Sequence, residues 1–164
     1  MLPVAGLVSA KTFLTYLGRN IFLSTQYIRH TNAPFYTPEP DIVHELIGHA
    51  ASLGHPAYAE LNRAFGRAAD RAEGDAITQL ERLYWYTMEF GVVQEAGQMK
   101  AYGAGLLSSY GELERFSTHA ELQPFNIDVM CATPHDPTEY QRTLFVAPNF
   151  AVLVEDLLRF LGAR

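Results

Sequence analysis

Length, composition and charge restrict what this chain can be. Its 164 residues are 48% hydrophobic, which is enough to build one core and little else. The net charge of -6, with no basic stretch, argues against nucleic acid or an anionic membrane as a partner. No run of about 20 apolar residues and no leader with a cleavage site is present, so we expect neither membrane insertion nor export. The single cysteine, Cys131, can form no internal disulfide, which suits a reducing cytoplasm.

The residue pattern predicts one mainly helical domain with little sheet, over residues 1–164. Segment 31–40 holds three prolines and should be an extended loop, because each proline disfavours helix at the residue before it. Asp41 is then placed to cap a helix that carries His44 and His49.

Apolar spacing predicts the later elements. Residues 56–71 and 75–90 carry apolar side chains at steps of three and four, which is typical of amphipathic helices. The glycine-rich segment 101–105 predicts a loop, 142–147 a short strand, and 150–161 an amphipathic closing helix.

The string HELIGH at 44–49, together with Glu89, is the strongest chemical signal. It supplies two imidazoles, and Glu89 adds a carboxylate. Such a set can hold one face of an iron(II) ion and leave the other face open to dioxygen or a substrate. The alternative is chance, because six histidines in a chain of this length will sometimes lie close together.

A zinc-hydrolase motif is a second interpretation, but its spacing does not fit. That motif places two histidines four residues apart on one helix face, with a glutamate as base. His44 and His49 are five apart, so at ~100° per residue they lie about 140° apart around a regular helix. Both can reach one metal only if the backbone between them is distorted, and Gly48 is where distortion costs least.

Four blocks of the sequence resemble the pterin-dependent aromatic amino acid hydroxylases, the family of the phenylalanine, tyrosine and tryptophan enzymes. The blocks are PVAGLVS (3–9), TQYIRHTNAPFYTPEPDIVHELIGH (25–49), YWYTMEFG (84–91) and KAYGAGLLSSYGEL (100–113), in the family's order and at similar spacing. The resemblance runs from Pro3 to about Phe150 and is greatest to the bacterial type of phenylalanine 4-hydroxylase. It implies that family's catalytic-domain fold, shortened at the N-terminus.

The resemblance implies two cofactors, iron(II) and a tetrahydropterin. The catalytic positions would be the metal ligands His44, His49 and Glu89 together with Glu45. The pterin-binding positions would be Gly6, Val8, Phe13 and Glu45, with the Phe13 ring stacked on the pterin. Ala10 and Leu23 stand where animal relatives more often have Ser and His, which should lower pterin affinity rather than abolish binding.

The resemblance also implies a site for the amino acid. Its matching positions are Arg29, Thr37, Pro40, Trp85, Phe90 and Ser108. Arg29 would grip the substrate carboxylate by two parallel hydrogen bonds, and the two aromatic residues would hold the substrate ring. The plainer alternatives are a surface charge for Arg29 and core packing for Trp85.

The implied activity is hydroxylation of the ring of an aromatic amino acid with reduced pterin and dioxygen. Phenylalanine is favoured over tryptophan because Trp85 is the residue type of the phenylalanine and tyrosine enzymes. One alternative is a hydroxylase that acts on tryptophan or tyrosine. Another is an iron-binding but catalytically impaired remnant, because family members carry a further part of the catalytic domain before the point where this chain begins. Without that cover, exposed apolar surface should leave a monomer that associates weakly with itself, and a frayed pterin segment should bind pterin loosely.

Overall fold

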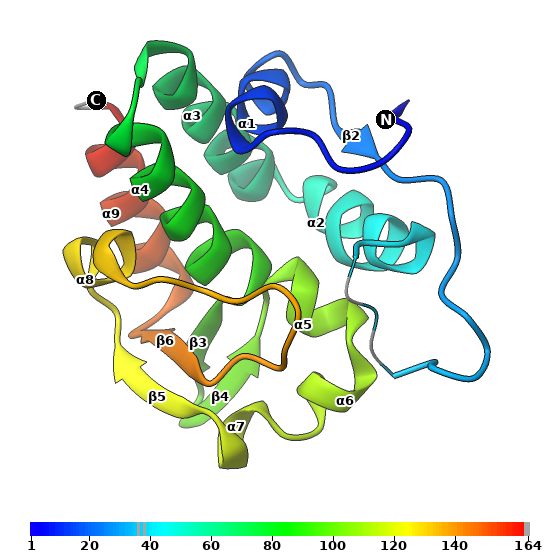
Figure 1. The fold of residues 1–164 in the computed structure, drawn as a ribbon. Helices are drawn as coiled ribbons and strands as arrows, with labels where there is room; N and C mark the ends of the chain where they lie inside the picture. Colours follow the sequence, from blue (N-terminus) through cyan, green and yellow to red (C-terminus); the bar gives the residue numbers. More distant parts are fainter. Residues whose placement is uncertain (36, 38, 163–164) are drawn as a thin grey trace.

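The long helix α3, Pro56–Arg71, lies at the centre of a helical layer. In the computed structural model, which describes residues 1–35, 37 and 39–162, three further helices pack against it (Figure 1). They are α1 (Ala10–Gly18), α4 (Asp75–Tyr84) and α9 (Phe150–Gly162). The resulting class is mainly helical, as the residue pattern predicts.

A small mixed sheet lies below this layer in Figure 1, in the order β4-β3-β6-β5. Its strands are β3 (Val92–Glu95), β4 (Gln98–Ala101), β5 (Glu121–Pro124) and β6 (Thr143–Ala147). Strands β3 and β4 form an antiparallel hairpin, and β6 runs parallel to both of its neighbours. Two short parallel strands, β1 (Leu2–Pro3) and β2 (Leu23–Ser24), join the N-terminus to the segment after α1.

Shorter helices connect these parts. Two are π-helices, η1 (His44–Ala50) and η2 (Trp85–Glu89), and η2 continues directly from α4. The others are α2 (Ala51–Leu53), α5 (Ala104–Ser108), α6 (Tyr110–Leu113), α7 (Phe116–His119) and α8 (Ile127–Ala132). Among the described residues, no helix is long and apolar enough to cross a membrane.

The core forms where the predicted apolar stripes meet. The buried stripe of α3 consists of Tyr58, Leu61, Phe65 and Ala68, at the spacing that predicted the helix. At the crossing of α1 and α3, Gly18 and Gly66 bring the two backbones together, and a Cβ on Gly66 would overlap the backbone of Gly18. The absence of side chains at this crossing therefore sets how closely α1 packs.

The predicted helices over 56–71, 75–90 and 150–161 and the strand over 142–147 are confirmed, the second helix as α4 followed by η2. Helix α1 was not predicted, although Ser9 caps it by accepting a hydrogen bond from the Thr12 amide. Tyr36 and Pro38 of the expected loop lie outside the described residues.

The loop predicted over 101–105 is wrong in part. Ala101 ends β4, and α5 begins at Ala104. The small residues here serve close packing, because a Cβ on Gly48 of η1 would lie 2.6 Å from the Ala104 carbonyl oxygen. Glycine and alanine thus let α5 pack against η1, and they do not mark a flexible segment.

The crossing of α1 and α3 gives a test of this packing. Gly66→Ala should destabilise the fold by about 1–3 kcal/mol, the usual cost of inserting a methyl group into a packed interior, measured by urea unfolding. Gly162→Ala at the end of α9 is the control, because nothing lies within 4 Å of its Cβ position. Equal stability of the two variants would contradict the close crossing.

Candidate active site

The two π-helices bring the three predicted metal ligands together. A π-helix has hydrogen bonds between residues five apart, so residues five apart lie on one face. In η1 the Ala51 amide donates to the Leu46 carbonyl, and in η2 the Phe90 amide donates to the Trp85 carbonyl at 2.8 Å. The five-residue spacing of His44 and His49 does not suit a regular α-helix, but it suits this π-helix. The backbone distortion that the sequence predicted is therefore present.

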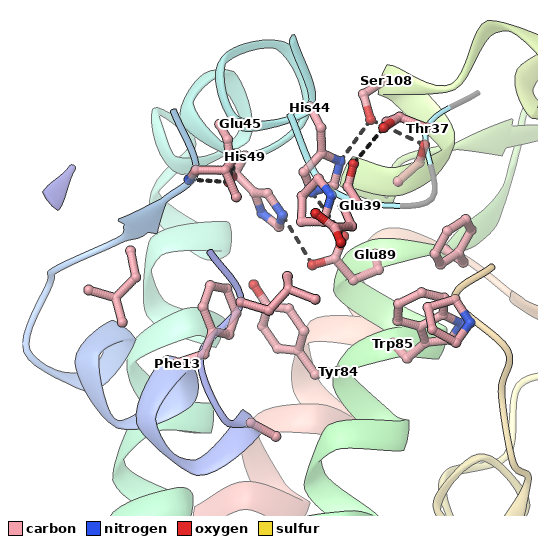
Figure 2. Close-up of a pocket in the computed structure, with 18 of the residues that line it drawn as sticks. Phe13, Thr37, Glu39, His44, Glu45, His49, Tyr84, Trp85, Glu89 and Ser108 are labelled. Carbon is pink, nitrogen blue, oxygen red and sulfur yellow. Dashed lines mark hydrogen bonds and ion pairs between the residues drawn. The ribbon is translucent and has the colours of Figure 1, made fainter. Parts of the chain in front are cut away.

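The ligand atoms of His44, His49 and Glu89 all lie within 4.8 Å of one another. His49 Nε2 is 3.0 Å from Glu89 Oε1, and His44 Nε2 is 3.6 Å from Glu89 Oε2. Figure 2 shows the three side chains converging from the two π-helices. Two nitrogens and a carboxylate at these separations suit a single divalent cation such as iron(II).

Ser108 fixes which nitrogen of His44 can bind a metal. The Ser108 hydroxyl lies 2.8 Å from His44 Nδ1 and 2.8 Å from the Ala104 carbonyl oxygen. The hydroxyl has one proton, which it donates to the carbonyl, so it must accept a hydrogen bond from Nδ1–H. His44 Nε2 is then left with its lone pair facing Glu89, as a metal ligand requires.

The pKa values of His44, His49 and Glu89 are set by burial and by the electrostatic interactions among these three side chains. Burial and the neighbouring His49 lower the pKa of His44 to about 4, so its ring is neutral at pH 7. Burial alone would lower the pKa of His49 and raise that of Glu89. Their mutual attraction outweighs this, so the pKa of His49 is raised and that of Glu89 is lowered. A cation bound by both groups would favour the neutral form of His49 and the ionised form of Glu89.

Glu45 is held beside the ligands by Thr25, the residue that follows β2. Its Oε1 accepts hydrogen bonds from the amide and the hydroxyl of Thr25, at 2.9 and 3.0 Å. Burial raises the pKa of Glu45, against the lowering effect of these hydrogen bonds. The carboxyl group is thus oriented and also borders the open cavity.

Arg29 is bound to a buried carboxylate, which the sequence did not reveal. Its Nε and Nη2 donate to the two oxygens of Asp41, each at 2.8 Å, and Nη1 donates to the Ser108 carbonyl at 3.0 Å. Burial alone would raise the pKa of Asp41, but hydrogen bonds from Arg29 and from the His44 and Arg29 amides lower it to about 2. The bidentate geometry expected for a substrate carboxylate is therefore used by Asp41.

All the predicted site residues line one cavity of about 530 Å³. They are Gly6, Val8, Phe13, Arg29, Thr37, Pro40, His44, Glu45, His49, Trp85, Glu89, Phe90 and Ser108. The positions matched to pterin binding and those matched to amino acid binding thus open onto one space that also contains the metal ligands (Figure 2). Thr37 is placed by hydrogen bonds to the Glu39 carbonyl at 2.8 Å and to the Tyr27 hydroxyl at 3.2 Å.

Aromatic rings form one wall of the cavity. The Trp85 ring lies 4.6 Å from that of Phe90, between centroids, and 4.3 Å from that of His135, on which it stacks at 20°. On the other side, Phe13 packs edge-on against Tyr84, with centroids 5.7 Å apart.

Several cavity residues escaped the sequence analysis. They include Glu39, Tyr84, Glu112, His135 and Thr138. Tyr84 and Glu39 lie inside two of the blocks that resemble the family, 84–91 and 25–49. Their closeness in sequence to the metal ligands could have identified them as cavity residues. His135 comes from the segment before β6, for which local sequence gave no chemical cue.

The sequence was also compared with those of known proteins. Residues 1–163 match the family of biopterin-dependent aromatic amino acid hydroxylases. The chain belongs to this family. Two relatives are phenylalanine-4-hydroxylase of Caenorhabditis elegans, 49% identical over 91% of this chain, and tyrosine 3-monooxygenase of Drosophila melanogaster, 46% identical over 90%. The matches span 33% and 26% of those relatives, so the chain corresponds to between a quarter and a third of their length.

Solved structures agree with this membership. Phenylalanine hydroxylase of Chromobacterium violaceum, with bound iron(III) and 7,8-dihydrobiopterin, has a TM-score of 0.87 and 31% identity. That match covers 98% of this chain and 60% of the other. Phenylalanine hydroxylase of Legionella pneumophila gives a TM-score of 0.87 at 30% identity, over 99% of this chain and 69% of the other. The fold is that of part of the family's catalytic domain.

The ligand geometry predicts how metal binding responds to substitution. His49→Ala should remove most bound iron or cobalt(II), because a two-ligand site cannot hold the cation. Ser108→Ala should weaken binding by roughly 10–100-fold, the usual effect of losing the partner that orients a ligand. Metal content after dialysis and the visible spectrum of cobalt(II) measure both effects.

The control is His119→Ala, because that exposed histidine in α7 lies outside the cavity. Full metal content in His49→Ala, or equal losses in His119→Ala, would show that the three ligands are wrongly assigned.

Proposed function

We propose that this chain is one catalytic domain that hydroxylates the ring of an aromatic amino acid, using iron(II), a tetrahydropterin and dioxygen. The preferred reaction is L-phenylalanine to L-tyrosine. The observation that carries the proposal is the single cavity in which a two-histidine, one-carboxylate cluster faces an aromatic wall and an arginine. Iron and reduced pterin, when bound, would supply the oxygen activation and the electrons.

The chain's own residues would hold and orient the reactants. His44, His49 and Glu89 would hold the cation on one side and leave its other positions facing the cavity. Glu45, fixed by Thr25, would offer its second oxygen toward the pterin. Phe13, held edge-on by Tyr84, would present a flat surface to the pterin ring.

The aromatic wall would place the substrate ring and keep water from it. Trp85 stacks on His135 and contacts Phe90, the residue after Glu89, and all three line the cavity with the metal ligands. A ring that rests on Trp85 and Phe90 would therefore be close to those ligands. Trp85 is the residue type of both the phenylalanine and the tyrosine enzymes, and the relatives include both, so Trp85 argues only against tryptophan. The choice of phenylalanine over tyrosine rests on the resemblance to bacterial phenylalanine hydroxylases. The five-residue histidine spacing and the family membership leave the zinc-hydrolase hypothesis without support.

Product analysis tests the proposal directly. Iron-loaded protein is mixed with phenylalanine, tyrosine or tryptophan, a tetrahydropterin and oxygen, and the hydroxylated products are quantified. We expect tyrosine from phenylalanine as the main product. If iron and pterin both bind but no amino acid is hydroxylated, the chain is the impaired remnant and the proposal fails.

The role of Arg29 in substrate binding can be tested with a variant that also changes its ion-pair partner, Asp41. Removing Arg29 alone would leave the fully buried Asp41 carboxylate unpaired and damage the fold. The double variant Arg29→Met/Asp41→Asn removes both charges and keeps an oxygen to cap His44. It should weaken amino acid binding by about 2–4 kcal/mol, on the scale of losing one buried charge-assisted contact. The Michaelis constant for the pterin should stay nearly constant.

Arg159→Met, in an exposed ion pair on α9, is the control for loss of a positive charge. A double variant whose constants for amino acid and pterin rise equally would identify Arg29 as purely structural.

Phe13 gives a prediction about pterin binding. Phe13→Leu keeps most of the volume but removes the flat ring, so pterin affinity should fall by about 0.5–1.5 kcal/mol, the value of one aromatic pair. Calorimetric titration of the metal-loaded protein with a dihydropterin measures this, and phenylalanine affinity serves as the internal comparison. Phe116→Leu is the matched control, because Phe116 is not among the residues that line the cavity. Unchanged pterin affinity in Phe13→Leu would remove Phe13 from the pterin site.

A further inference from the structure

The indole of Trp85 is held by one side chain from the segment before β6. We propose that Gln141 is a positioning residue that fixes the Trp85 indole in the cavity wall and thereby sets affinity and selectivity for the aromatic amino acid. The second half of this inference rests on the proposed function, since it assumes that the substrate ring lies on Trp85. The first half concerns the geometry of the wall alone.

The Gln141 side chain makes three hydrogen bonds, one through its oxygen and two through its nitrogen. Its Oε1 accepts from the Trp85 indole Nε1–H at 2.8 Å. Its Nε2 donates to the carbonyl oxygens of Asp136 and Glu139, at 2.9 and 3.0 Å. The oxygen faces a donor and the nitrogen faces two acceptors, so the amide can adopt only one orientation here.

These contacts connect the indole to the rest of the cavity wall. Segment 135–139 contributes four residues to the cavity lining, namely His135, Pro137, Thr138 and Glu139. The side-chain amide of Gln141 donates hydrogen bonds to two carbonyl oxygens of this segment. The Trp85 ring itself stacks on His135. The Gln141 side chain therefore joins the Trp85 indole to segment 135–139, which packs against it.

The main chain of Gln141 is held separately. Its amide nitrogen donates to Oε1 of Glu112 at 2.7 Å, and Glu112 is only 4% exposed. This bond does not involve the side chain and should survive a substitution. A change at Gln141 can thus release the indole while the chain stays in place.

Loss of the amide should change the shape of the cavity. An indole N–H that loses its acceptor in a half-buried site must find another partner or rotate toward water. Rotation would alter the space between Trp85 and Phe90, which are 4.6 Å apart between centroids. Binding of phenylalanine would then weaken, and discrimination against the larger tryptophan would fall.

The chain contains a single tryptophan, so its fluorescence reports on Trp85 alone. We compare three variants of the metal-loaded protein. Gln141→Leu removes all three side-chain contacts, and Gln141→Glu keeps an oxygen for the indole. Gln94→Leu, exposed on β3, is the control. Emission maximum and quenching by acrylamide are measured first, followed by calorimetric affinities for phenylalanine and tryptophan without oxygen.

We expect Gln141→Leu to shift the emission to the red, to increase quenching, and to weaken phenylalanine binding roughly tenfold. The phenylalanine-to-tryptophan affinity ratio should fall, while pterin affinity and metal content stay unchanged. Gln141→Glu should keep the emission closer to the parent only at a pH where its carboxyl group is protonated, because a carboxylate would repel the Asp136 and Glu139 carbonyl oxygens. In a Trp85→Phe background, which lacks the indole N–H, Gln141→Leu should have little further effect on affinity.

Parental emission and quenching in Gln141→Leu would overturn the proposal. So would an altered emission with an unchanged affinity ratio, or an equal loss of affinity in the Trp85→Phe background. These results are separate from failure of the proposed function, which is the absence of any hydroxylated product from the parent protein.

Discussion

The buried carboxylate of Asp41 is the contact on which the site depends most. It accepts three hydrogen bonds from Arg29, through the amide, Nε and Nη2, and one from the His44 amide at the start of the ligand helix. Because Asp41 is fully buried, these donors must stay in place or the charge is left uncompensated. The arginine that faces the substrate space and the helix that carries the histidines are thereby fixed relative to each other.

The sequence predicts the long elements well because each buries one periodic face. Helix α3 spans 56–71 in both prediction and structure, and β6 differs from its prediction by one residue. It predicts short elements poorly, because their form is decided by distant contacts. The helix at Ala104 depends on its packing against Gly48, more than fifty residues earlier, and no local pattern contains that information.

The same distinction holds in the site. The residue types of the metal cluster, and even the need for a distorted backbone near Gly48, follow from spacing and ligand chemistry. The hydrogen-bond partners of the site residues cannot be predicted in this way, because the partners lie far away in sequence. Ser108 orients His44, and Gln141 binds Trp85. Local sequence supplies the reacting groups, whereas the tertiary fold decides which of their atoms are free to react.

The π-helix of His44–Ala50 makes chain length as important there as residue identity. Deleting one residue between the two histidines would leave them four apart, and an ordinary α-helix would again place both on one face. Everything after the deletion would be rotated by about 100° relative to the residues before it. Gly48 would then no longer face Ala104. Helix α5, which carries Ser108, could no longer pack closely against η1. Substitutions at the exposed residues Leu46 and Ile47 should therefore be tolerated, whereas an insertion or deletion in this segment should not.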